Sequence, residues 1–197
     1  LLVVVTNSGR DDVLPASTDM NLYGGIYREA ELILTERTAV SPLYLGSDGV
    51  LVHPQTVGPE KVEGEIEVHI TSKGDNSCTL NVDITSPRGE RVFSKRQKAR
   101  LDGKPVTVAF SVDNPTLWSL RDPALYTVTA SIGEDSITDR VAVRTGFRSI
   151  GASTAEGLTI NGERIPVHGV ALYHDNALSG GTLVPEDYDT DLKMIRT

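Results

Sequence analysis

The chain has 197 residues, a formal net charge of −8 and a hydrophobic fraction of 39%. This length suits one domain with flanking sequence or two small domains, and enough hydrophobic residues are present for a core. An acidic chain without a basic cluster is a poor candidate for nucleic-acid or anionic-lipid binding, and no apolar run could span a membrane. One cysteine, Cys78, excludes an intrachain disulfide, which leaves the compartment open between cytoplasm and periplasm or secretion.

The first part of the chain predicts short strands separated by turns. Leu1 to Thr6 is an apolar, β-branched run that predicts a buried strand. Because it resembles the interior of a strand more than a natural N-terminus, we expect the sequence to be a piece of a longer protein. A second strand is predicted over Ala30 to Thr35, after paired glycines at 24–25 that indicate a tight bend or a bulge.

The middle of the chain alternates between apolar and polar residues. The alternation is clear over residues 65–71, 78–85 and 106–112, and turn sequences rich in Gly, Pro, Asn and Ser separate these runs. Short strands are also predicted at 40–44 and 50–52, and further strands at 124–132 and 137–144. Short alternating strands with frequent turns predict an all-β fold, an antiparallel β-sandwich of immunoglobulin type.

The pattern changes after Gly146. Asn161-Gly162 between two short apolar runs predicts a hairpin with a two-residue turn. Val167 to Leu172 is a compact apolar run that fits a strand buried on both faces, as in a parallel sheet. Pro185 followed by Glu and Asp then predicts the start of a helix. We expect one βα unit here, which is the beginning of a second domain.

Three stretches, in order along the chain, resemble segments of the glycoside hydrolase family 2 enzymes, which include β-galactosidases, β-glucuronidases and β-mannosidases. They are Asn21-Leu-Tyr-Gly-Gly-Ile-Tyr-Arg, then Asn114-Pro-Thr-Leu-Trp-Ser with Pro123-Ala-Leu-Tyr, and then Gly146-Phe-Arg followed by Leu158-Thr-Ile-Asn-Gly-Glu-Arg-Ile-Pro-Val-His-Gly-Val. The resemblance implies that residues 1–36 are the tail of a jelly-roll sugar-binding domain, that 37–146 form the immunoglobulin-like sandwich, and that 147–197 begin a TIM barrel.

The resemblance also implies the chemistry of the full-length enzyme, which is hydrolysis of β-glycosidic bonds with retention of configuration by two glutamates. In the family both glutamates lie on later barrel strands, so the resemblance places no catalytic residue in this chain. We therefore expect the 197 residues alone to be inactive, and the sandwich to act as a structural spacer between the sugar-binding and catalytic domains.

Substrate contacts are expected in the loop after the first barrel strand, because barrel active sites lie at that end of the strands. Family members often carry two histidines and an aspartate there; by position Tyr173 replaces the first histidine, and His174 and Asp175 match the others. A role in loop structure stays open for His174 and Asp175. Asp19 has the spacing from Arg28 of an aspartate that reaches the active site and a sodium site in large bacterial β-galactosidases, although a capping role in a loop is the simpler interpretation.

Few other side chains suggest a site. His53 and His69 are expected on the sandwich surface, and no metal site is predicted because no second ligand lies at a suitable spacing. The resemblance implies no cofactor for this stretch and leaves a sodium or magnesium ion open for the whole enzyme. Trp118 is expected to pack at a junction between domains, with sugar stacking as the alternative.

Two other functional interpretations stay open. The chain could be a free-standing carbohydrate-binding or adhesion-type β-sandwich, or a structural immunoglobulin-like repeat. A binding module should show several exposed aromatic residues on one sheet face, whereas aromatic residues make up 5% of this chain. No internal repeat is visible, which counts against the structural repeat. The glycosidase interpretation implies a carbohydrate as the partner and neither nucleic acid nor membrane.

Overall fold

The computed structural model describes residues 2–4, 26 and 30–196. Residues 34–167 form one compact unit, and the residues from His168 onward belong to a second. The first unit contains all the strands that the described residues form, and the second contains the helix α1 (Pro185–Arg196). Each unit is described separately below.

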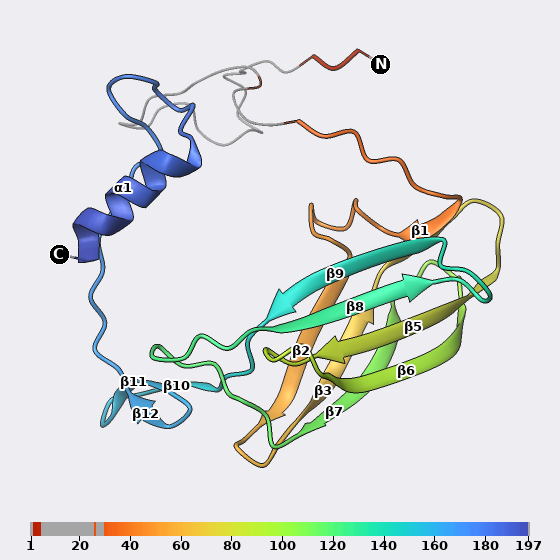
Figure 1. The fold of residues 1–197 in the computed structure, drawn as a ribbon, viewed down its shortest axis with the longest axis horizontal. Helices are drawn as coiled ribbons and strands as arrows, with labels where there is room; N and C mark the ends of the chain where they lie inside the picture. The colour runs from red at the N-terminus through yellow and green to blue at the C-terminus, as the bar shows by residue number, and fades with distance from the viewer. Residues whose placement is uncertain (1, 5–25, 27–29, 197) are drawn as a thin grey trace. The chain divides into compact units, whose positions relative to one another are not determined.

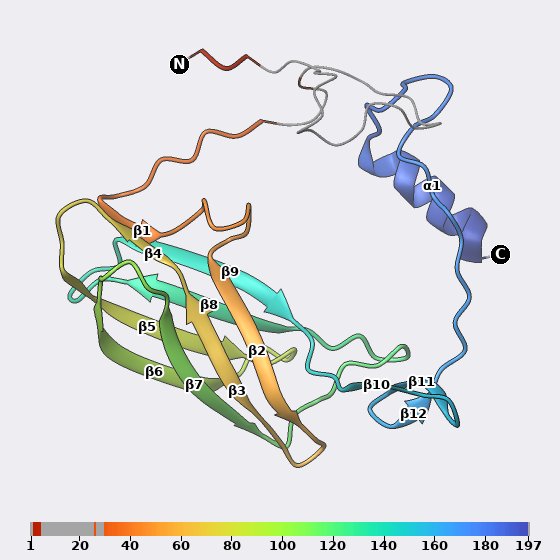
Figure 2. The same cartoon turned by 180° about the vertical axis from the view of Figure 1, so that it is seen from behind.

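The first unit is built on two antiparallel sheets that face each other (Figures 1 and 2). One sheet has the order β2-β3-β7 and the other has the order β6-β5-β8-β9. Their strands are β2 (Val50–Val57), β3 (Lys61–Val68), β5 (Ser77–Thr85), β6 (Arg91–Arg100), β7 (Val106–Asp113), β8 (Tyr126–Ile132) and β9 (Asp139–Thr145). Because the chain crosses between the sheets after β3, β6 and β7, the fold is a Greek-key sandwich, and the predicted all-β antiparallel sandwich is confirmed.

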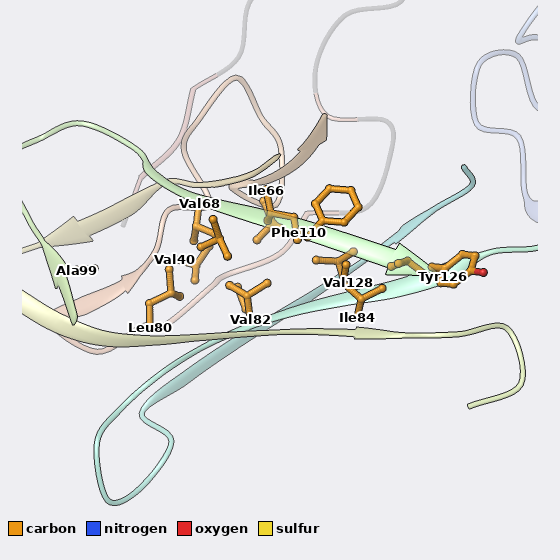
Figure 3. Packing of buried hydrophobic residues seen from close by; sticks show 14 of the residues in the cluster. Val40, Ile66, Val68, Leu80, Val82, Ile84, Ala99, Phe110, Tyr126 and Val128 are labelled. Carbon is orange, nitrogen blue, oxygen red and sulfur yellow. The ribbon is translucent and has the colours of Figure 1, made fainter. Parts of the chain in front are cut away.

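Strand alternation produces the core. In β3, Val62, Ile66 and Val68 are fully buried, and in β5 Leu80, Val82 and Ile84 are fully buried. These side chains meet between the sheets, as Figure 3 shows for Ile66, Val68, Leu80, Val82 and Ile84. The residues between them point outward, as the period of two requires. The alternation over residues 65–68 and 78–85 therefore places its apolar residues in the core as predicted, whereas the strand predicted through residue 71 is broken at His69.

Two short strands connect the edges of the sandwich. β1 (Thr38–Val40) pairs with β4 (Ile70–Ser72), which follows β3 after a break at His69. The Val40 N–H also donates to the Asp139 carboxylate at 2.7 Å, which ties β1 to the start of β9. The predicted strand at residues 40–44 is thus shorter and lies earlier than expected.

A small three-stranded sheet follows the sandwich within the first unit. It consists of β10 (Ile150–Ser153), β11 (Gly157–Ile160) and β12 (Glu163–Arg164), all antiparallel. The β11–β12 turn has positive φ at Asn161 (51°) and Gly162 (79°), as a type I′ turn requires. The predicted hairpin is confirmed, whereas β10 was not predicted.

Two predicted strands are wrong. Residues 30–36 form no strand and are exposed, and the apolar run at residues 167–172 forms none either, with Val170 67% exposed. A strand buried on both faces gains its hydrogen bonds and its burial from neighbouring strands, and none pairs with this segment in the described structure. The predicted strand over residues 1–6 lies mostly outside the described residues, and residues 2–4 form no strand.

Candidate functional site

The predicted substrate loop lies in the second unit, between residue 168 and α1. Tyr173 is 64% exposed, His174 is exposed and Asp175 is half-buried. The chain bends at His174. The loop therefore presents a phenol, an imidazole and a carboxylate, which are groups that hydrogen-bond to sugar hydroxyls.

His174 is positioned by the helix. Its Nδ1 lies 3.2 Å from the Tyr188 hydroxyl, and the two rings lie 5.8 Å apart at an angle of 60°. Tyr188 stands one turn into α1, whose start is fixed by a reciprocal cap in which the Val184 N–H donates to the Asp187 carboxylate and the Asp187 N–H donates to the Val184 carbonyl, both at 3.0 Å. The contact engages Nδ1, so Nε2 is the nitrogen through which His174 would meet a ligand.

Asn176 organises the turn that follows these residues. Its side-chain oxygen accepts hydrogen bonds from the N–H groups of Leu178 (2.9 Å) and Ser179 (2.8 Å). Its backbone pairs with Gly180 in an isolated antiparallel bridge. Sequence reasoning missed this role, although asparagine is a common residue in such side-chain-closed turns.

The described residues contain no group of three or more His, Cys, Asp or Glu side chains that could hold a metal ion. Asp19 lies outside the described residues. Over the described part of the chain, the helix is too short and too polar to cross a bilayer.

Trp118 packs against the segment that leaves the sandwich. Its backbone N–H donates to the Phe147 carbonyl at 2.9 Å. Its ring lies so close to Gly146 that a Cβ added there would be 2.8 Å from the ring. The Arg148 guanidinium lies over the ring at 4.8 Å. These contacts agree with a packing role for Trp118 and leave little of its ring face for sugar stacking.

Asn161 joins the small sheet to the loop that carries Trp118. Its side-chain oxygen accepts the Ser149 N–H and its side-chain nitrogen donates to the Trp118 carbonyl, both at 3.0 Å. Its backbone N–H donates to the Ser149 carbonyl at 2.9 Å. The turn residue that closes the hairpin therefore also joins the hairpin to the loop before β8. Sequence analysis predicted the turn but not this second role.

A tyrosine at the start of β8 fixes that loop from the other side. Tyr126 is buried, and its hydroxyl accepts the Thr116 N–H at 2.9 Å. Its ring packs on the fully buried Phe147 with centroids 4.6 Å apart, and Phe147 also stacks on Phe110 at 5.8 Å. A tyrosine that reaches back from a late strand to the preceding connection is the tyrosine corner of immunoglobulin-like sandwiches.

The expectation that His69 is a surface residue is wrong. Its side chain is 13% exposed, stacks on Tyr44 with centroids 3.5 Å apart, and contacts the Glu67 carboxylate at 2.5 Å. His53 lies 3.5 Å from the other oxygen of Glu67 and is half exposed, as expected. His69 occupies the break between β3 and β4, where both of its backbone groups pair with residues of the 41–49 loop, and that loop covers its ring.

Cys78 behaves as a structural residue. Burial raises the pKa of its thiol, and the negative charge of Asp75 adds to the rise. A raised pKa suppresses the thiolate that nucleophilic chemistry needs. Cys78 packs against the core as a small, partly buried residue.

The protein-family comparison gives one match. The model for the glycosyl hydrolases family 2 matches residues 50–148, which is half of the chain. A β-glucuronidase from Bacteroides fragilis is 30% identical over the whole chain, and a β-galactosidase from Thermoanaerobacterium thermosulfurigenes is 22% identical over the whole chain. The chain spans 29% and 27% of the length of these two relatives.

Solved structures of β-glucuronidases are also similar to this chain. The chain is similar to Bacteroides uniformis β-glucuronidase 2 covalently bound to cyclophellitol-6-carboxylate aziridine, with a TM-score of 0.79, 25% identity, and coverage of 98% of this chain and 24% of that one. It is also similar to the FMN-binding β-glucuronidase from Faecalibacterium prausnitzii L2-6, with a TM-score of 0.80, 31% identity, and coverage of 92% and 28%. With the family model matched through the sandwich as far as Arg148, the chain belongs to the glycosyl hydrolases family 2.

Proposed function

We propose that this chain is the central part of a retaining β-glycosidase, in which the sandwich is a structural spacer between a sugar-binding domain and a catalytic barrel. The observation that carries the proposal is the coverage: the whole chain aligns with a β-glucuronidase of which it spans 29%. In this proposal residues 1–36 end the sugar-binding domain, 37–146 form the spacer and 147–197 begin the barrel. The contacts of Trp118, Phe147 and Asn161 support the role of a spacer, because they make the exit from the sandwich rigid.

The proposed substrate contacts are Tyr173, His174 and Asp175, with Asp19 reaching the same sugar from the N-terminal part. The exposure of Tyr173 and the anchoring of His174 by Tyr188 support the first two. The catalytic glutamates would lie outside this chain, so its own residues bind and orient a sugar and hydrolyse nothing. A β-galactoside or a β-glucuronide is the substrate class that agrees with the relatives' names.

Activity measurements on two proteins test the proposal. The 197-residue chain and the product of its complete gene are incubated with 4-nitrophenyl β-galactoside, β-glucuronide and β-mannoside. We expect the complete product to release nitrophenol from one of them and the chain alone to release none. Hydrolysis by the chain alone would contradict the proposal, and so would a complete gene product without activity on any β-glycoside.

Variants of the complete product test the contacts. Tyr173→Phe keeps the ring and removes the hydroxyl, and His174→Ala removes the imidazole with both of its hydrogen-bonding nitrogens. A lost contact to a substrate hydroxyl should lower kcat/KM by about tenfold or more. Leu178→Ala, at an exposed position of the following turn, is the matched control and should leave kcat/KM unchanged. Unchanged kinetics in both site variants would remove this loop from the substrate site.

A further inference from the structure

The outer face of the sheet β6-β5-β8-β9 is polar, and small polar side chains fill its centre. In β5 and β8 the residues that alternate with the buried core residues point away from the core. Nearly all of them are small hydroxyl or amide residues, and the register places them side by side in the centre of the face: Thr79, Asn81, Asp83, Thr85, Thr127, Thr129 and Ser131. None of these residues is aromatic, so the centre offers hydrogen-bonding groups and no stacking platform.

Cations border this face on both sides. On β6, Arg96 and Lys98 pair with Asn81 and Thr79, and on β9, Arg140 and Arg144 pair with Ser131 and Thr127. All four of these cations are exposed. Directly paired residues share a face, so the four positive charges flank the polar centre, although the chain as a whole carries a net charge of −8. Three strand spacings separate β6 from β9, about 14 Å, which is the length of a short oligosaccharide.

A hollow of about 260 Å³ lies at one end of this face. It is lined by Asn81, Arg96, Ser131 and the turn from Gly133 to Ile137. The Arg96 guanidinium donates to the Glu134 carbonyl at 2.7 Å, which holds it beside the hollow while its other N–H groups remain available for a planar anion. Glu134 and Asp135 in the same turn favour hydroxyl groups next to that anion.

The only acidic residue in the centre of the face is under-satisfied. Asp83 Oδ2 accepts a hydrogen bond from the Asn81 amide at 2.7 Å, but Oδ1 is buried and has no hydrogen-bond partner within the described residues. The exposed Arg91 lies 3.9 Å from Oδ1, beyond hydrogen-bonding distance. A buried acceptor without a donor is costly, so a ligand that brings a hydroxyl donor to Oδ1 would relieve this cost.

We propose that this outer basic face, formed by Arg96 and Lys98 on one edge, Arg140 and Arg144 on the other, and the polar centre around Asn81 and Asp83, binds an acidic polysaccharide built of uronic acid units. The sugar carboxylates would pair with the arginines and the sugar hydroxyls with the central groups. DNA supplies phosphate acceptors to the arginines but no hydroxyl donors for Asp83, so the centre favours the polysaccharide. The inference does not rest on the proposed hydrolysis, because binding is measured without turnover.

The test is affinity electrophoresis of the 197-residue chain through native gels that contain polygalacturonate, a linear uronic acid polymer. We expect retardation that falls with rising salt, and none in neutral dextran. The double variant Arg96→Gln/Arg140→Gln should bind at least about tenfold more weakly. The control Lys73→Gln/Lys104→Gln makes the same change of charge in exposed turns outside the face and should change the affinity less than about twofold.

A second variant distinguishes specific binding at this face from general attraction between opposite charges. Asp83→Leu makes the face more positive and removes both acceptor oxygens at similar volume, so attraction of polyanions alone would tighten binding, whereas loss of the hydroxyl acceptor weakens it. The proposal expects weaker binding. Tighter binding by Asp83→Leu would overturn it, as would equal losses in the two double variants, no retardation of the wild type, or equal affinity for a DNA duplex of matched charge. Thermal midpoints close to that of the wild type would show that the variants are folded.

Discussion

Phe147 is expected to be the main anchor of the segment that leaves the sandwich. It is fully buried, packs on Tyr126 and Phe110, and accepts the Trp118 N–H with its carbonyl. Phe147→Ala removes the ring and leaves a cavity between the sheets, because β strands on both sides cannot close on it without breaking their registers. Such truncations cost ~3–5 kcal/mol, and for a chain of this size that lowers the unfolding midpoint by about 6–20 °C.

Urea denaturation measures this loss of unfolding free energy. Trp118 is the single tryptophan of the chain, so its fluorescence reports on the same junction. The emission should shift to the red in the folded variant, since the residue that packs beside it loses its anchor. Ile150→Ala, three residues later and 63% exposed, is the control and should cost less than about 0.5 kcal/mol. A loss below about 1.5 kcal/mol for Phe147→Ala, or one equal to the control's, would refute the anchor.

Three further predictions concern single groups. Asn161→Ala removes two hydrogen bonds and places alanine at a φ of 51°, so the hairpin should open ~2–3 kcal/mol more easily in hydrogen exchange, whereas unchanged protection of its amides would contradict the clamp. Tyr126→Phe leaves the Thr116 N–H without its partner and should cost ~1–2 kcal/mol in urea denaturation. The raised pKa and the partial burial of the Cys78 thiol should make its alkylation by iodoacetamide at pH 8 slower in the folded chain than in the unfolded chain, and equal rates would contradict this. Because this pKa is raised on folding, the associated stability is present below the unfolded thiol's pKa and declines as pH rises through the folded one.

Local sequence was sufficient wherever a short-range pattern sets the structure. The alternation in residues 65–68, 78–85 and 106–112 predicts which side chains are buried, because the strand period of two fixes their side of the sheet. Asn161-Gly162 predicts the hairpin because both turn positions need positive φ, and Pro185 with two acids predicts the start of α1. Motif order along the chain was also sufficient to predict the family.

Only the tertiary structure decided the features that depend on residues far apart in sequence. The burial of His69 follows from the 41–49 loop that folds over it, and the contact of Tyr126 with Thr116 follows from the crossing between sheets. The run at 167–172 is apolar enough for a buried strand, but a strand needs partners, and sequence alone cannot supply them. The outer basic face is invisible in composition, because its arginines lie on β6 and β9 and only sheet register brings their charges to one surface.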